Sequence, residues 1–187
     1  MRLAGTVAVV TTALAVIDML NSYVFDHADR LAESVERALP AIVGLIERAR
    51  AQGAPIIYVN DNFGRWDCDR HALVRRLLDG RRANLIEPIV PEEDALFVVK
   101  ARHSIFYETP LGYLLRSEEI DRLVLTGQVT EQCILYSALD AHIRHVPTVI
   151  PRDAVAHIDP ELARAALRMM EVNMDAEVCD SAEVRFS

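Results

Sequence analysis

The sequence predicts an α/β fold, in which a parallel sheet of about six strands lies between two layers of helices. Short apolar stretches that are typical of buried strands alternate with amphipathic stretches of helical period along the chain. Such alternation is typical of β-α-β units, whose crossover helices cover both faces of a parallel sheet. The 187 residues carry no internal repeat or linker, so we expect a single domain spanning residues 1–187.

The first expected strand begins near Thr11 and ends at an acid, Asp18. The first twenty residues also look like a signal peptide, but cleavage after Ala15 would remove most of this strand. The apolar run is too short to span a bilayer. We therefore expect it to remain part of the domain. Residues 1–10 are then either an N-terminal extension or the product of a start codon assigned too early.

A long helix is expected over residues 30–52, where apolar side chains recur at helical spacing. Pro40 should kink or divide it, because proline lacks the N–H that an interior position donates. Gly53 should end it. A strand over residues 56–60 and a helix over residues 70–78 follow.

After an irregular segment and a loop with two prolines, a third apolar strand ends at a base, Lys100. Asp159 is a good N-cap for the last helix, because its side chain can accept the free N–H groups of the first turn. The remaining elements are expected at 113–119 (helix), 122–126 (strand), 131–145 (helix), 147–150 (strand), 160–174 (helix) and 177–179 (strand).

Three reactive residue types, Asp18, Lys100 and Cys133, come at or just past the ends of expected strands. In an open parallel sheet these ends line one crevice, where ligands bind. Cys133 falls in the first turn of the 131–145 helix, where unpaired N–H groups and the helix dipole favour a thiolate. The alternative is that Cys133 is a small buried apolar residue.

Four segments resemble the isochorismatase-like cysteine hydrolase superfamily, which includes nicotinamidases and N-carbamoylsarcosine amidase: AVIDMLNSY, YVNDNFGRW, VVKARHSIFYETPL and LTGQVTEQCILYSALDA. The resemblance implies a three-layer, Rossmann-like fold with Asp18, Lys100 and Cys133 as a catalytic triad. It further implies a cis peptide bond between Gln128 and Val129. The backbone N–H groups of Val129 and Cys133 would then form an oxyanion hole.

The resemblance implies hydrolysis of a C–N bond in a small amide or ureido compound through a thioester. Asp18 would act as general base, with a pKa raised by burial, and Lys100 would stabilise the charges of Asp18 and Cys133. Two alternatives remain. The chain could hydrolyse the ether of isochorismate, or it could be a non-catalytic member that binds a small ligand or a partner protein.

No metal ion and no cofactor are expected. Nicotinamidases bind a metal through an Asp-x-His and a further histidine after the second strand, whereas here Asp61 is followed at plus two by Phe63. This difference also argues against nicotinamide as the substrate. Asp61 is expected to be a turn or capping residue.

The candidate substrate-binding residues lie in the loops that follow the second and third strands and beside the expected cis bond: Phe63, Trp66, Phe106, Tyr107 and Gln128. A lone tryptophan can instead serve packing, and Gln128 can instead only hold its loop. His103 is expected to be structural. Arginines 75, 76, 81 and 82 form a solvated rim or, alternatively, steer an anionic substrate.

Acidic residues exceed basic ones, 28 against 20, giving a net charge of −8 that argues against nucleic acid or an anionic membrane as partner. Cys68, Cys133 and Cys179 form no paired framework, which favours a reduced, cytoplasmic protein with Cys68 and Cys179 as inert thiols. The resemblance also implies a homodimer or homotetramer.

Overall fold

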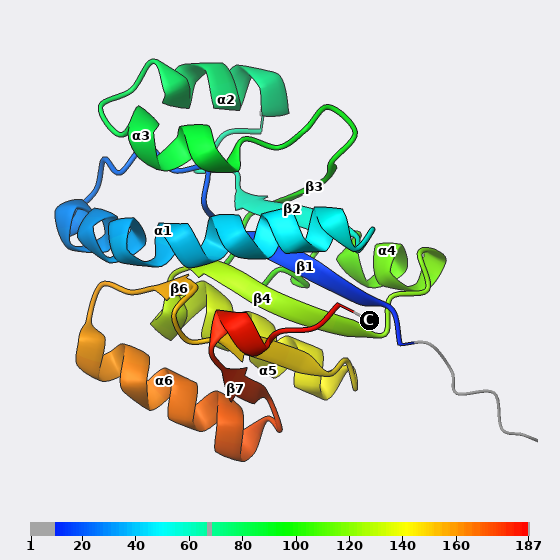
Figure 1. Ribbon diagram of the computed structural model, residues 1–187. Coiled ribbons are helices and arrows are strands. Elements are labelled where there is room, and N and C mark those ends of the chain that lie inside the picture. The colour runs from blue at the N-terminus through cyan, green and yellow to red at the C-terminus, as the bar shows by residue number, and fades with distance from the viewer. Residues whose placement is uncertain (1–9, 67–68, 187) are drawn as a thin grey trace, which may run out of the picture.

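The computed structural model describes residues 10–66 and 69–186, and their strands form one parallel sheet (Figure 1). The strands are β1 (Thr12–Ile17), β2 (Ile56–Asp61), β3 (Leu96–Lys100), β4 (Arg122–Gln128), β5 (Thr148–Pro151), β6 (Val155–Ala156) and β7 (Glu177–Cys179). Their order across the sheet is β3-β2-β1-β4-β5-β7, with β6 paired to β4. The predicted α/β class is therefore confirmed, with seven strands where about six were expected.

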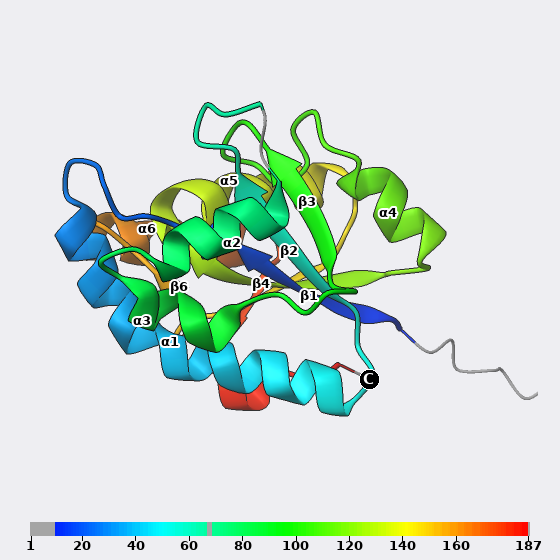
Figure 2. The same cartoon turned by 90° about the horizontal axis from the view of Figure 1, so that it is seen from above.

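Helices cover both faces of this sheet. They are α1 (Ala28–Ala51), α2 (Arg70–Leu78), α3 (Ala83–Ile86), α4 (Leu111–Ser117), α5 (Leu135–Ile143) and α6 (Pro160–Asn173). Helices α1 to α3 pack on one face and α4 to α6 on the other, and Figure 2 shows α1 and α4 on opposite sides. None of the helices in the described part of the chain is long and apolar enough to cross a lipid bilayer.

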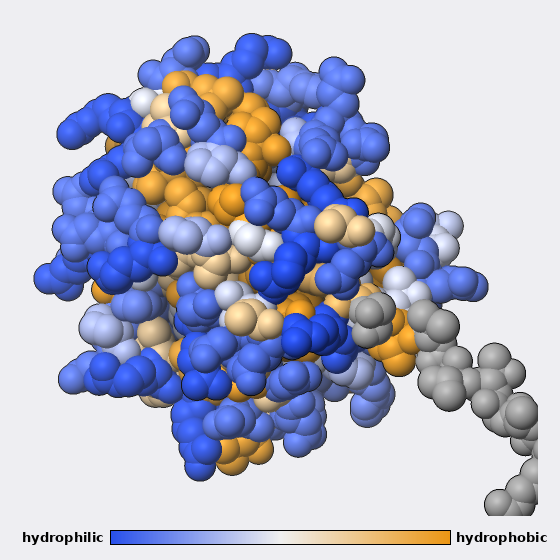
Figure 3. Space-filling view, viewed as in Figure 1, coloured by the Kyte–Doolittle hydropathy of each residue, from blue (hydrophilic) through white to orange (hydrophobic). Residues whose placement is uncertain are grey.

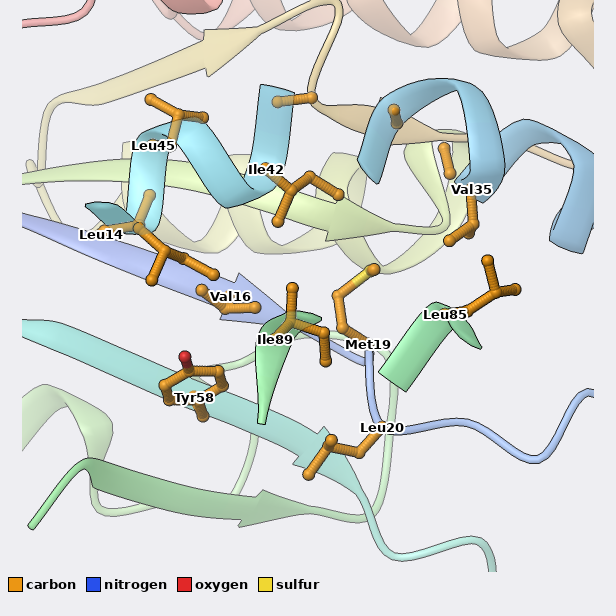
Figure 4. Packing of buried hydrophobic residues seen from close by; sticks show 14 of the residues in the cluster. Leu14, Val16, Met19, Leu20, Val35, Ile42, Leu45, Tyr58, Leu85 and Ile89 are labelled. Atoms are coloured by element: carbon orange, nitrogen blue, oxygen red, sulfur yellow. The ribbon is translucent and has the colours of Figure 1, made fainter. Parts of the chain in front are cut away.

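The strands are apolar on both faces because each face meets helices. In β1, Leu14 and Val16 point to the α1 side, while Ala13, Ala15 and Ile17 point to the other. Figure 4 shows side chains of α1 lying over Leu14 and Val16. In Figure 3, hydrophobic side chains fill the region between α1 and the α2–α3 layer, with hydrophilic residues around them.

Pro40 does not divide α1, which runs unbroken from Ala28 to Ala51. The prediction of a division was wrong because buried side chains continue on both sides of the proline. Val35 precedes it and Ile42 follows it, and both pack against the sheet while Pro40 itself faces solvent. The packing of this continuous stripe outweighs one lost backbone hydrogen bond.

Other differences from the expected elements are small. The segment 80–84, expected to be irregular, includes the start of the four-residue helix α3. The two-residue strand β6 was missed altogether. The helix expected at 131–145 is a π-helical turn, Thr130–Ile134, followed by α5. The extension expected at residues 1–10 lies, but for Val10, outside the described residues, as does Cys68.

Gly127 sets the distance between the ends of β1 and β4. It pairs with Ile17 in the register of these strands. Its φ is +112°, and a Cβ at this position would lie 2.2 Å from the carbonyl oxygen of Ile17. Only glycine tolerates this combination. The close approach brings the residues after Gly127 next to Asp18, which follows Ile17.

Candidate active site

The ends of three strands bring Asp18, Lys100 and Cys133 together. Asp18 directly follows β1, Lys100 is the last residue of β3, and Cys133 lies in the π-helical turn after β4. All three are buried, with exposed fractions of 6%, 2% and 8%. The structure thus groups the three residues that the sequence singled out.

Lys100 is the centre of this cluster. Its Nζ lies 2.9 Å from Asp18 Oδ2 and 3.7 Å from Cys133 Sγ. A second carboxylate, Asp61 Oδ2, lies 3.5 Å from the same nitrogen. The ammonium therefore faces two carboxylates and the sulfur at once, and a side-chain hydrogen bond also joins Asp18 and Cys133.

Asp18 is held from several sides. Its backbone has φ +56°, an uncommon conformation for a residue with a side chain. The backbone N–H of Asp61 donates to Asp18 Oδ1 at 2.8 Å, and Gln128 Nε2 donates to the Asp18 carbonyl at 2.5 Å. The side chain of Asn60 bonds both backbone groups of Leu20. The loop after β1 is thus fixed to β2 and β4.

The turn that carries Cys133 is anchored at both ends. Thr130 Oγ1 donates to the Ala156 carbonyl at 2.9 Å, which ties the start of the turn to β6. Ser137 Oγ donates to the Cys133 carbonyl and accepts the N–H of Ile105 at 3.1 Å. The Gln128–Val129 peptide bond is cis, and the N–H of Val129 donates toward Cys133 Sγ.

Burial dominates the protonation of this site. It raises the pKa of Asp18 more than the Lys100 ammonium lowers it. Burial lowers the pKa of Lys100, but the charges of Asp18, Cys133 and Asp61 outweigh it, so the net shift is upward. Burial, followed by the charge on Asp18, raises the pKa of Cys133.

The net shift of the Cys133 pKa is therefore upward, which favours the thiol. This direction is opposite to the one expected from the place of Cys133 at a helix start. Exclusion of water and the adjacent Asp18 carboxylate outweigh both the Lys100 ammonium and the N–H of Val129.

The sulfur opens onto a pocket of about 420 Å³, hereafter the catalytic pocket. Its walls come from the β1–α1 loop, the β2–α2 loop and the π-helical turn. The side chains around its mouth include Asn21, Phe25, Asp26, His27, Phe63 and Gln132. A volume of this size suits a small molecule.

Only some of the predicted substrate-binding residues line the catalytic pocket. Phe63 lines the catalytic pocket, and so does Gln128, whose amide also bonds Asp18 and the hydroxyl of Tyr23. Phe106 does not line it, because its ring is buried in the core beneath the site. Trp66 and Tyr107 also lie outside the lining, and Trp66 is 87% exposed.

Three parts of the chain lie closer to the reactive cluster than expected from the sequence: Asp61, His103 and the β1–α1 loop. Asp61 does form a turn, accepting the N–H of Phe63 at 2.7 Å, but its other oxygen faces Lys100. His103 lines the catalytic pocket with Nδ1 3.9 Å from Cys133 Sγ. The β1–α1 loop, including Phe25, was not considered. The position of Asp61 at the end of β2 could have indicated its role.

Among the residues that the structure describes, no group of three or more histidine, cysteine, aspartate and glutamate side chains could hold a metal ion. Asp61, which begins the metal motif in nicotinamidases by resemblance, here bonds within its own turn and faces Lys100. Cys179 is a free, buried cysteine on β7, and burial raises its pKa.

The family model of the isochorismatase domain matches residues 12–183, which is nearly the whole described chain. The chain belongs to the isochorismatase family. Within this family it is 35% identical over 172 residues to the uncharacterized protein YaaI of Bacillus subtilis (strain 168), covering 92% of this chain and 95% of YaaI.

Two further relatives of this isochorismatase-family hydrolase carry amidase names. It is 30% identical over 203 residues to ureidoacrylate amidohydrolase RutB of Enterobacter sp. (strain 638), and the match covers 91% of this chain and 88% of RutB. The structure resembles N-carbamoylsarcosine amidase from Thermoplasma acidophilum with a TM-score of 0.70 and 26% identity, covering 94% and 99% of the two chains. Both relatives are named for the hydrolysis of C–N bonds.

Proposed function

We propose that this protein is a cysteine amidohydrolase that cleaves a C–N amide or ureido bond of a small molecule through a thioester. The observation that carries the proposal is the position of Lys100 Nζ, 2.9 Å from Asp18 and 3.7 Å from Cys133, beside a pocket that exposes the sulfur. A nucleophile, a base and a fixed cation are the parts that acyl transfer needs.

In the first step, Cys133 Sγ attacks the carbonyl carbon while the Asp18 carboxylate takes the thiol proton. The raised pKa of Asp18 makes it a better base than an ordinary carboxylate. The carbonyl oxygen becomes an oxyanion, for which the backbone N–H groups of Val129 and Cys133 are the proposed donors. Each such donor contributes about 3 kcal/mol to stabilising the transition state in other hydrolases.

In the second step, the C–N bond breaks and protonated Asp18 gives its proton to the leaving nitrogen. Ammonia or an amine departs and leaves a thioester on Cys133. Asp18, again a carboxylate, takes a proton from water as the water oxygen attacks the thioester. Cleavage of the C–S bond releases the acid, and protonated Asp18 returns its proton to the leaving sulfur, which restores the thiol and the Asp18 carboxylate.

Lys100 keeps its positive charge throughout, because Asp18, Asp61 and Cys133 raise its pKa. Its ammonium offsets the negative charge that builds up on the sulfur as the proton leaves. Because its side chain is shielded from solvent, this interaction is stronger than it would be in water.

The test is ammonia release from a panel of primary amides and ureido compounds. The panel includes ureidoacrylate and N-carbamoylsarcosine, with nicotinamide as the expected negative. We expect turnover that is lost in Cys133→Ala and kept in Cys179→Ala, which removes the other described buried thiol. No release from any compound, or equal release by Cys133→Ala, would contradict the proposal.

We also propose a homodimer or homotetramer. Apolar side chains lie exposed on the outer faces of α5 and α6: Tyr136, Leu139, Ile143, Leu162, Met169 and Val172. Contiguous exposed apolar surface is typical of protein interfaces. Light scattering during gel filtration should give two or four times the monomer mass of 20.9 kDa, and the monomer mass would contradict the proposal.

A further inference from the structure

The catalytic pocket adjoins a second hollow, which in turn adjoins a third. Asn21, Phe25 and Phe63 line both the catalytic pocket and a connecting pocket of about 330 Å³. The connecting pocket in turn shares Arg76 and Leu77 with a third hollow of about 310 Å³. We call this third hollow the arginine pocket, since Arg76, Arg81 and Arg82 line it.

The three arginines of this pocket differ in their partners. Arg82 is neutralised by Asp29 at 2.9 Å and Glu36 at 3.3 Å. The guanidinium groups of Arg76 and Arg81 make no hydrogen bond or ion pair with the residues that the structure describes. Two cations without a partner among the described residues therefore line one hollow of a protein whose net charge is −8.

The charges that line the catalytic pocket are mainly negative, unlike those of the arginine pocket. Three carboxylates line it, those of Asp18, Asp26 and Asp61, and the one ammonium beside them, Lys100, is already paired. An anionic group of a ligand would be repelled in the catalytic pocket and attracted in the arginine pocket. The charge pattern therefore orients a ligand with its neutral amide near Cys133 and its anionic group at Arg76 and Arg81.

We propose that the arginine pocket binds the carboxylate of a substrate whose amide or ureido group reaches Cys133. The substrate class is then a monoamide or ureido derivative of a carboxylic acid. This inference rests on the proposed function for the identity of the reacting group. Arg76 and Arg81 suit this task because a planar guanidinium binds a carboxylate through two parallel hydrogen bonds.

The test is calorimetric binding to the Cys133→Ala protein, in which turnover cannot obscure affinity. The ligands are the monoamides of malonic, succinic, glutaric and adipic acid, each compared with its neutral diamide. We expect at least one monoamide to bind about tenfold more tightly than its diamide. The preference should shrink as salt is added, because the rim of the pocket is exposed.

Arg76→Ala or Arg81→Ala should remove most of this preference. Arg75→Ala is the matched control, because it deletes the same charge from α2, the helix that carries Arg76, at a residue that lines none of the three hollows. Equal binding of every monoamide and diamide, no binding of any monoamide, or a preference that survives both Arg76→Ala and Arg81→Ala would overturn the inference.

Ammonia release by the unmodified protein separates this inference from the proposed function. Monoamide binding that depends on Arg76, without ammonia release from any compound, would contradict only the amidohydrolase proposal. Release from diamides as fast as from monoamides, with no effect of Arg76→Ala, would contradict only the assignment of the arginine pocket.

Discussion

The Lys100 ammonium and the Asp18 carboxylate form an ion pair of 2.9 Å that solvent hardly reaches, with side-chain exposures of 0% and 8%. Removing one partner of such a pair leaves the other charge buried. We expect Lys100→Met to lower the free energy of unfolding by about 3–5 kcal/mol. Urea denaturation measures the change. The double variant Lys100→Met/Asp18→Asn should recover part of the lost free energy of unfolding. A change near zero in the single variant Lys100→Met would contradict the ion pair.

The pH dependence of activity should report the raised pKa of Asp18. Burial raises this pKa above the ordinary value of 3.8, and the carboxylate form is the one that accepts the thiol proton. Activity is therefore lost as the pH falls through the raised pKa, at a higher pH than for an exposed carboxyl group. The profile of kcat/KM against pH measures it. A fall in kcat/KM that occurs only at or below pH 3.8, the ordinary pKa of an aspartate, would contradict the assignment of Asp18 as the base.

Alkylation should show that Cys133 is a thiol at rest. Because burial and Asp18 raise its pKa, labelling by iodoacetamide should keep rising beyond the ordinary thiol value of 9.0. Asp18→Asn removes one cause, so this variant should label faster at pH 8. Mass spectrometry locates the label. A plateau below about pH 8.5 in the unmodified protein would show instead an armed thiolate.

Gly127→Ala should destabilise the fold severely. The added Cβ would lie 2.2 Å from the Ile17 carbonyl, at a φ of +112° that alanine rarely adopts. We expect a loss above about 3 kcal/mol in denaturant titrations. Gly44→Ala is the matched control, because Gly44 lies inside α1 and an added Cβ there would meet only Arg48 Nη1, at an ordinary contact distance of 3.9 Å. There alanine should add about 0.5–1 kcal/mol of stability.

The ends of the first and third strands were predictable from the sequence because their apolar runs stop at charged residues, Asp18 and Lys100. In a parallel sheet these ends must meet at one edge, so Asp18 and Lys100 could be placed together without a structure. Gly127 and the segment after it completed the pattern through their resemblance to a known family. The helices followed in the same way from apolar periodicity.

The walls of the pocket were not predictable, because loop side chains follow local backbone angles that the sequence pattern does not fix. Phe63 lines the pocket, and its own backbone has an uncommon φ of +50°. Phe106, an aromatic residue six positions after Lys100, turns into the core instead. The upward shift of the Cys133 pKa could not be predicted for a related reason, since it comes first from burial, which is a property of the folded site.

The most direct test of the account is to trap the acyl group on the enzyme. The protein is mixed with its fastest substrate from the amide panel, quenched in acid and digested for mass spectrometry. We expect the peptide that contains Cys133 to gain the mass of the acyl group, and Cys133→Ala to show neither adduct nor turnover. Turnover that persists in Cys133→Ala, or an acyl group found on Cys179 instead, would contradict the account.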